Sequence, residues 1–175
     1  GDIKEILRPE EWLPLIAERK EKVRTIFELL GTYIPKERIG ITGSYLCGLN
    51  GEKSDLDFVI YGLKNFNKAR AIIEDARVEG LGMKEEVWNQ IYKKRKPELS
   101  YEEFVAHERR KRNRGAIDNS YFDILYVRDP KELKQLDIRD YERGEKVGYG
   151  KITAEVKDAS FSFDSPAIYE IDHQC

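Results

Sequence analysis

Apolar residues return every three to four positions in four parts of the chain, which is the spacing of amphipathic helices. The four predicted helices span residues 10–30, 66–78, 83–94 and 101–114. Shorter runs rich in β-branched and aromatic residues predict strands instead. These strands are expected at residues 37–42, 56–61 and 121–127. Strands interleaved with helices favour an α/β (α+β) fold, with a small mixed sheet and helices packed on it.

From residue 141 onward the helical spacing is lost. Residues 151–157 alternate apolar and polar, residues 158–160 suit a turn, and residues 167–171 form another short strand. These features predict a β-hairpin or the opening of a small β module. Because a single hairpin is marginally stable in water, it either packs on the main domain or begins a second domain that continues beyond Cys175.

The expected domain organisation follows from these two patterns. Residues 1–140 form the main domain, with a helical insert at about residues 83–114. Residues 141–175 form a β appendage or a truncated second domain. A chain of 175 residues is long enough to bury one good core and a small appendage.

Charged residues make up 37% of the chain and the net charge is −2, which excludes a protein that coats nucleic acid with its whole surface. No apolar run approaches the roughly 18 residues of a membrane span and no signal peptide is expected, so we predict a cytoplasmic protein without a membrane partner. Cys47 and Cys175 are not placed for a disulfide or a zinc site, and Cys47 is expected to be a small packed residue. The pattern carries no signal for an oligomeric state.

The segment from Gly43 to Asp57 joins a Gly-Ser turn to two carboxylates at alternate positions of a predicted strand. Because side chains at i and i+2 of a strand share a face, Asp55 and Asp57 project together. Two such carboxylates raise each other's pKa, which a fold tolerates most easily when a divalent cation lies between them. Mg²⁺ (or Mn²⁺) prefers such oxygen ligands together with substrate phosphates. Turn chemistry is the alternative for Ser54 and Asp55, but it does not explain Asp57 inside the apolar run.

Asp123 is a third carboxylate, and it lies among apolar and aromatic residues in the predicted strand at 121–127. An acid inside such a run is costly unless it is paired, hydrogen-bonded or bound to a metal. The alternative is a strand whose aspartate simply faces water, as on the solvated face of an antiparallel sheet. We expect Asp123 to join the other two carboxylates.

The order of these features resembles the DNA polymerase beta-type nucleotidyltransferase superfamily. In its minimal nucleotidyltransferases and archaeal CCA-adding enzymes, a strand and a Gly-Ser pair are followed, after a loop, by an Asp-x-Asp motif on a second strand. Here Gly43-Ser44 is followed by Asp55-Leu56-Asp57, and Asp123 stands on a later strand. The resemblance covers residues 36–62 and 119–127, about a fifth of the chain.

The resemblance implies a Mg²⁺-dependent enzyme that transfers a nucleoside monophosphate from a nucleoside triphosphate to a hydroxyl acceptor and releases pyrophosphate. The acceptor it implies is an RNA end, a protein or a small molecule. It implies that the catalytic and metal-binding residues are Asp55, Asp57 and Asp123. It implies that the nucleotide is bound by Gly43, Ser44, Lys53 and Ser54. Two metals held in this way stabilise both the attacking and the leaving oxygen. Minimal nucleotidyltransferases often carry arginine where this chain has Cys47, so the missing positive charge is expected from Lys53 or from a basic segment further along.

That basic segment spans residues 93–114, which contain nine Lys or Arg residues and four Glu residues. Its position just before the strand of Asp123 favours neutralisation of the phosphates of a nucleotide or an acceptor, with RNA preferred over a protein acceptor. The alternative is an ordinary solvated helix surface. Its second helix begins with Ser100 and Glu103, the pair that forms a capping box. His107 is expected to be a surface or packing residue, because two-metal chemistry needs no histidine.

Two other functions compete with nucleotide transfer. A non-catalytic module could use the same fold and the basic helices to bind nucleic acid. An antitoxin-like module would instead bind a protein partner. Three clustered acids facing an anionic ligand argue against pure nucleic-acid binding, because such a site has no use for them.

Overall fold

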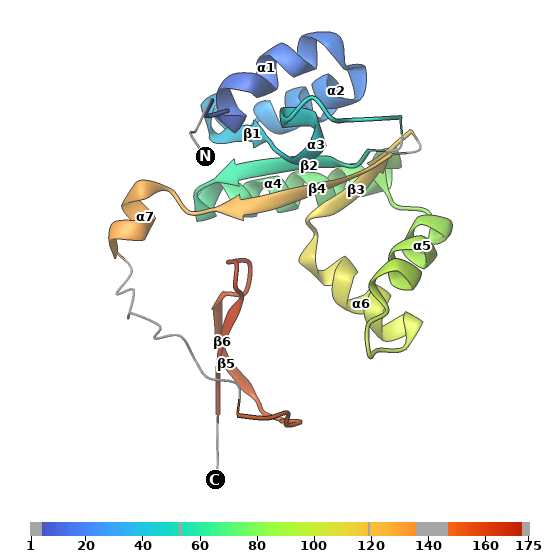
Figure 1. Cartoon of the computed structure of the whole chain (residues 1–175), viewed down its shortest axis with the longest axis vertical. Coiled ribbons are helices and arrows are strands. Elements are labelled where there is room, and N and C mark those ends of the chain that lie inside the picture. Colours follow the sequence, from blue (N-terminus) through green and yellow to red (C-terminus); the bar gives the residue numbers. More distant parts are fainter. Residues whose placement is uncertain (1–4, 53, 119, 136–146, 173–175) are drawn as a thin grey trace. The chain divides into compact units, whose positions relative to one another are not determined.

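The computed structural model describes residues 5–52, 54–118, 120–135 and 147–172 (Figure 1). The chain forms two compact units, Gly1–Val127 and Arg128–Cys175. The boundary expected between residues 140 and 141 falls outside the described residues and stays a prediction.

The first unit is built on a four-stranded mixed sheet with the strand order β1-β2-β4-β3. Its strands are β1 (Ile39–Ile41), β2 (Leu56–Tyr61), β3 (Arg114–Ile117) and β4 (Ser120–Val127). β2 and β4 run parallel, while β1 and β3 pair antiparallel on the two outer sides. The predicted α/β (α+β) class with a mixed sheet is confirmed.

The two faces of this sheet carry different side chains. The fully buried apolar residues of β2 and β4 that share one face are Leu56, Phe58, Ile60, Phe122 and Ile124. Helix α4 (Leu63–Ala76) packs against both strands. Helix α2 (Glu21–Gly31) contacts the same face, because its Lys22 donates a hydrogen bond to Ser120, which lies two positions before Phe122 on β4. Asp57 and Asp123 alternate with these residues and therefore face the other side.

The long helix expected at residues 10–30 is two helices, α1 (Pro9–Arg19) and α2, so that prediction was wrong in this respect. The break is at Lys20, whose backbone is extended. One continuous helix would carry the buried stripe of Leu13 and Ala17 on to Lys20 and Arg24. Breaking at Lys20 instead allows α2 to bury a different set, which comprises Val23, Ile26, Phe27 and Leu30.

Three other predicted boundaries also shift. β1 is shorter than residues 37–42, because the 3₁₀ turn η1 (Lys36–Arg38) precedes it. Helix α4 begins three residues earlier than expected, after Gly62, and is followed by the π-helical turn η2 (Arg77–Leu81). The helix expected to reach Arg114 ends at Lys111, because Arg112 adopts a left-handed backbone with φ of 53°. Strand β3, which was not predicted, therefore begins at Arg114.

Helices α5 (Glu85–Arg95) and α6 (Tyr101–Lys111) form the helical segment expected between residues 83 and 114. They bury a small apolar cluster of their own, made of Trp88, Ile91, Phe104 and Val105. The predicted capping box of α6 is confirmed. The Ser100 hydroxyl accepts from the backbone N–H of Glu103 at 3.2 Å, and the Glu103 carboxylate accepts from that of Ser100 at 2.9 Å.

Ser100→Ala should lower the free energy of unfolding by about 1 kcal/mol, because it removes the side-chain acceptor at the start of α6. Urea denaturation followed by circular dichroism measures this loss. Ser100→Thr keeps a hydroxyl at the same position and should lose much less. If the two variants lose the same stability, the hydroxyl is not what stabilises this helix end.

The second unit contains α7 (Pro130–Gln135) and a hairpin of β5 (Val156–Phe161) and β6 (Ile168–Ile171). A hairpin was predicted here, but its first strand is shifted: residues 158–160 lie within β5 and not in a turn. The register is irregular on both sides of Asp158, whose carboxylate accepts hydrogen bonds from Ser160. Within the described part of the chain, no helix is long and apolar enough to cross a membrane.

Candidate active site

The parallel pairing of β2 and β4 brings two of the predicted carboxylates side by side. Asp57 and Asp123 are direct partners in the register of these strands. Asp57 is half-buried, whereas Asp123 is only 9% exposed. Asp55 lies two residues before Asp57 and is half-buried as well. The sheet thus brings the distant Asp123 beside Asp57, with Asp55 close by in the chain.

Gly43 lies directly against this group. Its backbone has a φ of +64°, and a Cβ added to it would overlap Oδ2 of Asp57. The adjacent backbone is tied to β2, because the N–H of Thr42 donates to the carbonyl of Asp57 at 2.8 Å. A glycine is therefore required here both by its conformation and by the close approach of the carboxylate. Gly43 and Ser44 open the short helix α3 (Gly43–Leu46).

The carboxylates act on one another electrostatically. Burial raises the pKa of Asp57, and the negative charge of Asp55 raises it further. Burial also raises the pKa of Asp123; the Arg114 guanidinium beside it acts in the opposite direction, and Asp57 adds to the rise. Ionising all of these acids together is therefore costly in the absence of a compensating cation.

Tyr121 belongs to this site, although the sequence analysis did not single it out. Its phenol forms a side-chain hydrogen bond with Asp55. Burial raises the pKa of Tyr121, and the hydrogen bond to Asp55 raises it further, so the phenol stays a donor. The sequence did hold a signal, because Tyr121 and Asp123 are two positions apart on one strand and share a face.

Arg114 is the second residue that the sequence analysis did not place in the site. It stands opposite Asp123 in the pairing of β3 with β4, and its Nε lies 2.5 Å from Oδ1 of Asp123. Its Nη1 lies 2.6 Å from Oε2 of Glu108, a residue of α6 that is itself buried. Its sequence position suggested only the end of a basic helix. The unpredicted strand β3 is what turns its side chain toward Asp123.

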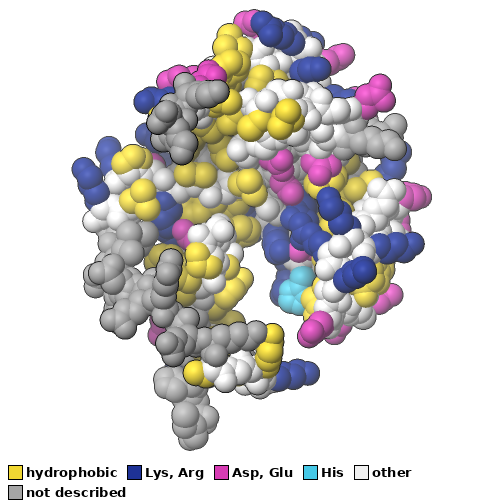
Figure 2. Space-filling view, viewed as in Figure 1, with side chains coloured by type: hydrophobic (Ala, Val, Ile, Leu, Met, Phe, Trp, Pro, Cys, Tyr) yellow, Lys and Arg dark blue, Asp and Glu magenta, His cyan; other side chains and the backbone are white. Residues whose placement is uncertain are grey.

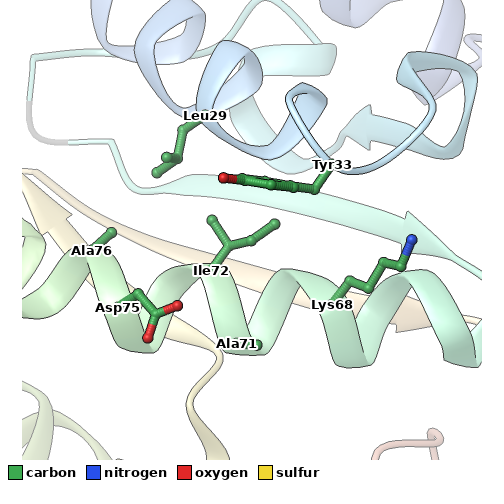
Figure 3. A pocket seen from close by; sticks show the side chains of 7 residues that line it. All are labelled: Leu29, Tyr33, Lys68, Ala71, Ile72, Asp75 and Ala76. Carbon is green, nitrogen blue, oxygen red and sulfur yellow. The ribbon is translucent and has the colours of Figure 1, made fainter.

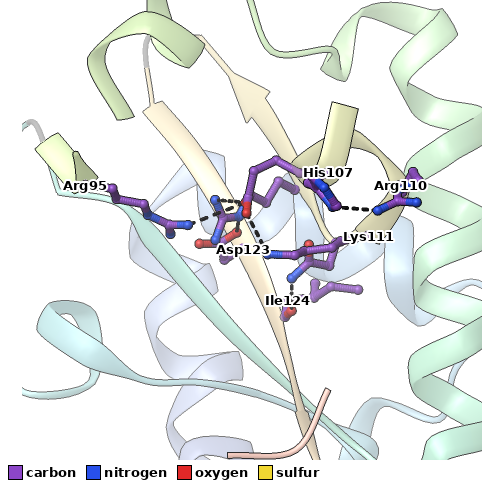
Figure 4. Close-up of polar contacts among 9 residues, drawn as sticks. Arg95, His107, Arg110, Lys111, Asp123 and Ile124 are labelled. Atoms are coloured by element: carbon purple, nitrogen blue, oxygen red, sulfur yellow. Dashed lines mark hydrogen bonds and ion pairs between the residues drawn. The ribbon is translucent and has the colours of Figure 1, made fainter. Parts of the chain in front are cut away.

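Two further cations form ion pairs with Glu108. Lys111 Nζ lies 2.6 Å from its Oε1, and Arg95 Nη1 lies 3.5 Å from its Oε2. Burial acts to raise the pKa of Glu108, but Lys111, Arg114 and Arg95 together hold it below its ordinary value. Figure 4 shows Arg95 and Lys111 reaching from their helices toward the strand of Asp123. Figure 2 likewise shows acidic side chains directly beside Lys and Arg side chains on the face viewed.

Other predicted site residues are placed differently. The Ser54 hydroxyl accepts a hydrogen bond from the N–H of Gly51 at 2.9 Å and so stabilises its own loop. Lys53 lies outside the described residues. Cys47 was expected to be packed but is exposed, because the loop after α3 leaves it on the surface. His107 is exposed as expected and lies 2.5 Å from the Arg110 guanidinium.

The fit of these residues to a divalent cation is uneven. Asp55 and Asp57 supply hard oxygen ligands in an environment that favours a cation. Among the residues that the structure describes, however, no three His, Cys, Asp or Glu side chains converge closely enough to hold a metal ion. On the β4 side, Asp123 is instead paired with Arg114. Asp55 and Asp57 therefore fit a metal as a pair, whereas Asp123 is engaged by a cation of the protein itself.

A groove of 590 Å³ between α2 and α4 is a separate feature (Figure 3). Its lining residues are Leu29, Tyr33, Lys68, Ala71, Ile72, Asp75 and Ala76. None of the predicted site residues lines it. The groove lies between the helices, and the carboxylates project from the opposite face of β2 and β4, so it is not the candidate active site.

A family model described as "Nucleotidyltransferase domain" matches residues 20–113, more than half of the chain. The chain belongs to the nucleotidyltransferase domain family. The predicted resemblance is confirmed, and the family supports transfer from nucleoside triphosphates as the general activity. The matched part of the chain contains Gly43, Asp55 and Asp57, whereas Arg114 and Asp123 lie just beyond it.

One curated relative is "Uncharacterized protein MJ1086" of Methanocaldococcus jannaschii. It is 39% identical to this chain over 160 residues, which cover 87% of the chain and 46% of the relative. The chain thus spans about half the length of the curated relative that it matches. No solved structure matches the chain significantly.

Gly43→Ala should destabilise the protein more than Gly48→Ala. Both glycines have a left-handed backbone, with φ of +64° and +66°, so alanine costs about 1–2 kcal/mol at either position. Only at Gly43 does the new Cβ overlap the Asp57 carboxylate, since no described atom lies within 4 Å of it at Gly48. We expect a further loss of about 1–3 kcal/mol for Gly43→Ala in urea denaturation. Equal losses would show that Gly43 is not packed against Asp57.

Proposed function

We propose that this protein transfers a nucleoside monophosphate from a nucleoside triphosphate to a hydroxyl acceptor, with release of pyrophosphate. The observation that carries the proposal is the side-by-side placement of Asp57 and Asp123, with Gly43 packed on Asp57, in a chain of the nucleotidyltransferase family. Family membership supports the reaction class, and the geometry supports this choice of residues.

In the proposed reaction, the acceptor oxygen forms a bond to the α-phosphorus of the triphosphate. The bond between that phosphorus and the oxygen bridging to the β-phosphorus breaks, and its electron pair leaves with pyrophosphate. The hydroxyl proton passes to Asp123 and then to solvent. A divalent cation held by Asp55 and Asp57, Mg²⁺ or Mn²⁺, would supply charge neutralisation at the phosphates.

The other residues of the site hold and orient the reactants in this proposal. The backbone at Gly43 and Ser44 approaches the β- and γ-phosphates, because glycine leaves room for a close anion. Tyr121 orients Asp55 through its hydrogen bond. Arg114 balances the charge of Asp123 until the acceptor arrives. Lys53 and Ser54 are proposed at the nucleotide on the family resemblance alone.

The test is transfer of α-phosphate label from each of the four nucleoside triphosphates, with Mg²⁺ or Mn²⁺, into a cell extract. The products are separated into RNA, protein and small molecules. Label in any of these fractions that disappears without divalent metal supports the proposal. A folded protein that transfers no label from any triphosphate and binds none of them contradicts it.

One observation favours the alternative of a non-catalytic binding module. Among the described residues no three ligands converge on one metal position, and Asp123 is engaged by Arg114. Under this alternative the basic helices hold a nucleic acid or a protein partner while no transfer takes place. Partner binding without label transfer would then be the result of the same experiment.

A further inference from the structure

The strand order gives the candidate active site two different flanks. Gly43 follows β1 on one side, Arg114 begins β3 on the other, and Asp57 and Asp123 lie on the two strands between them. If the triphosphate tail lies at Gly43, as the proposed function requires, the acceptor approaches from the side of Arg114. The chemistry of that second flank therefore indicates which acceptor the site takes.

This flank carries positive charge that its own carboxylates do not balance. Among the described residues, Arg95, Lys111 and Arg114 form ion pairs with two acids, Glu108 and Asp123. Arg114 is buried between both acids, with 9% of its side chain exposed. The side chains of Arg95 and Lys111 are each 44% exposed, although each contacts the 5% exposed side chain of Glu108. An anion from solution can reach these two cations and complete the charge balance.

The cations are also held in a defined place, unlike those of a freely solvated charge run. The Arg70 Nε of α4 donates to the carbonyl of Lys111 at 2.6 Å. Arg77 Nε donates to the carbonyl of Arg114 at 3.3 Å, and its Nη1 donates to that of Arg109 at 3.5 Å. These bonds engage carbonyls at and just beyond the C-terminal end of α6. The end of α6 is thereby joined to the helix that packs on β2 and β4.

We propose that Arg95 and Lys111, oriented by the buried Glu108, form a phosphate-binding site on the acceptor side of Asp123. The inference rests on the proposed function and names its acceptor: a polynucleotide end, whose terminal hydroxyl lies next to a phosphodiester. Lys93 and Lys94 in the last turn of α5 and Lys96 at its C-cap are exposed and add positive charge near Arg95, which suits a ligand with several phosphates. A protein acceptor would need no such row of cations.

The test measures how the full 175-residue chain binds a short single-stranded oligoribonucleotide with a free 3′ hydroxyl. Fluorescence anisotropy gives the affinity over a series of salt concentrations. We expect Arg95→Gln to weaken binding about tenfold and to reduce the slope of log K against log salt by about 0.7, the value for one phosphate contact on a single strand. Lys111→Gln should behave similarly, and Arg95→Lys should keep most of the affinity.

Lys68→Gln is the matched control, because Lys68 is an exposed cation of α4 beside the groove of Figure 3. It should change neither the affinity nor the salt slope. A second titration, with each magnesium nucleoside triphosphate, should give the same affinity for Arg95→Gln as for the unmodified protein. An equal affinity would show that Arg95 does not bind the triphosphate, which is proposed to lie at Gly43.

Several results would overturn this inference. Triphosphate binding without oligoribonucleotide binding contradicts the inference and leaves the proposed function standing, as does label transferred only to protein. Equal losses of oligoribonucleotide affinity in Arg95→Gln and Lys68→Gln would show that any removed positive charge weakens binding, wherever it lies on the protein. A matching loss of triphosphate affinity in Arg95→Gln would place Arg95 at the nucleotide. Failure to bind any triphosphate overturns the proposed function itself, and the inference with it.

Discussion

Asp57→Asn should abolish nucleotide transfer while leaving the protein folded. The substitution removes one of the two oxygen ligands proposed for the metal, and metal-bound charge stabilisation contributes several kcal/mol to such reactions. A loss of that size corresponds to a rate lower by about 10³-fold or more. The measurement is the rate of α-phosphate label transfer under the conditions that give the highest activity of the unmodified protein.

The stability of Asp57→Asn should stay unchanged or rise. Burial and the charge of Asp55 both raise the pKa of Asp57, so at neutral pH its ionised form is disfavoured in the fold. A neutral amide relieves this cost. Asp75→Asn, on the exposed surface of α4, serves as the control and should keep full activity. An Asp57→Asn variant that still transfers label would show that the metal site has been assigned wrongly.

Arg114→Met should lower the free energy of unfolding by about 3–5 kcal/mol, the largest stability effect that we expect in this protein. The reason is that Arg114 is paired with two buried acids at once, at 2.6 Å from Glu108 and 2.5 Å from Asp123. Removing the guanidinium leaves Asp123 without the cation that opposes its burial. Urea denaturation of the purified variant measures the loss.

Two further variants show whether the loss comes from the ion pairs of Arg114 or from removing any positive charge. Arg109→Met removes an exposed arginine whose nearest acid, Glu85, is 3.8 Å away and also exposed, so its loss should stay below about 1 kcal/mol. Adding Glu108→Gln to Arg114→Met removes one of the two buried acids that have lost Arg114 as their partner, and should recover part of the stability. If Arg114→Met is no worse than Arg109→Met, the buried ion pairs do not stabilise the fold.

Several elements of the fold could be predicted because their signals are local. The strands of Asp57 and Asp123 are short runs of β-branched and aromatic residues, and the capping box of α6 is a pair of residues three positions apart. The break at Lys20 was missed. Apolar residues recur every three to four positions in both α1 and α2, so the spacing alone does not distinguish two short helices from one long helix. Strand β3 was missed because it has only four residues and closely follows α6, so the spacing of apolar residues does not mark where the helix ends and the strand begins.

By itself, the sequence determined the family and the pairing of Asp55 with Asp57, because both depend on spacing along one short segment. It also indicated Gly43 and Asp123 as partners of that pair. Only the tertiary structure decided that Asp123 lies beside Arg114 and that Glu108 gathers Arg95 and Lys111 around it. The physical reason is that these contacts depend on the strand order β1-β2-β4-β3 and on the docking of α6, which are set by packing between distant segments.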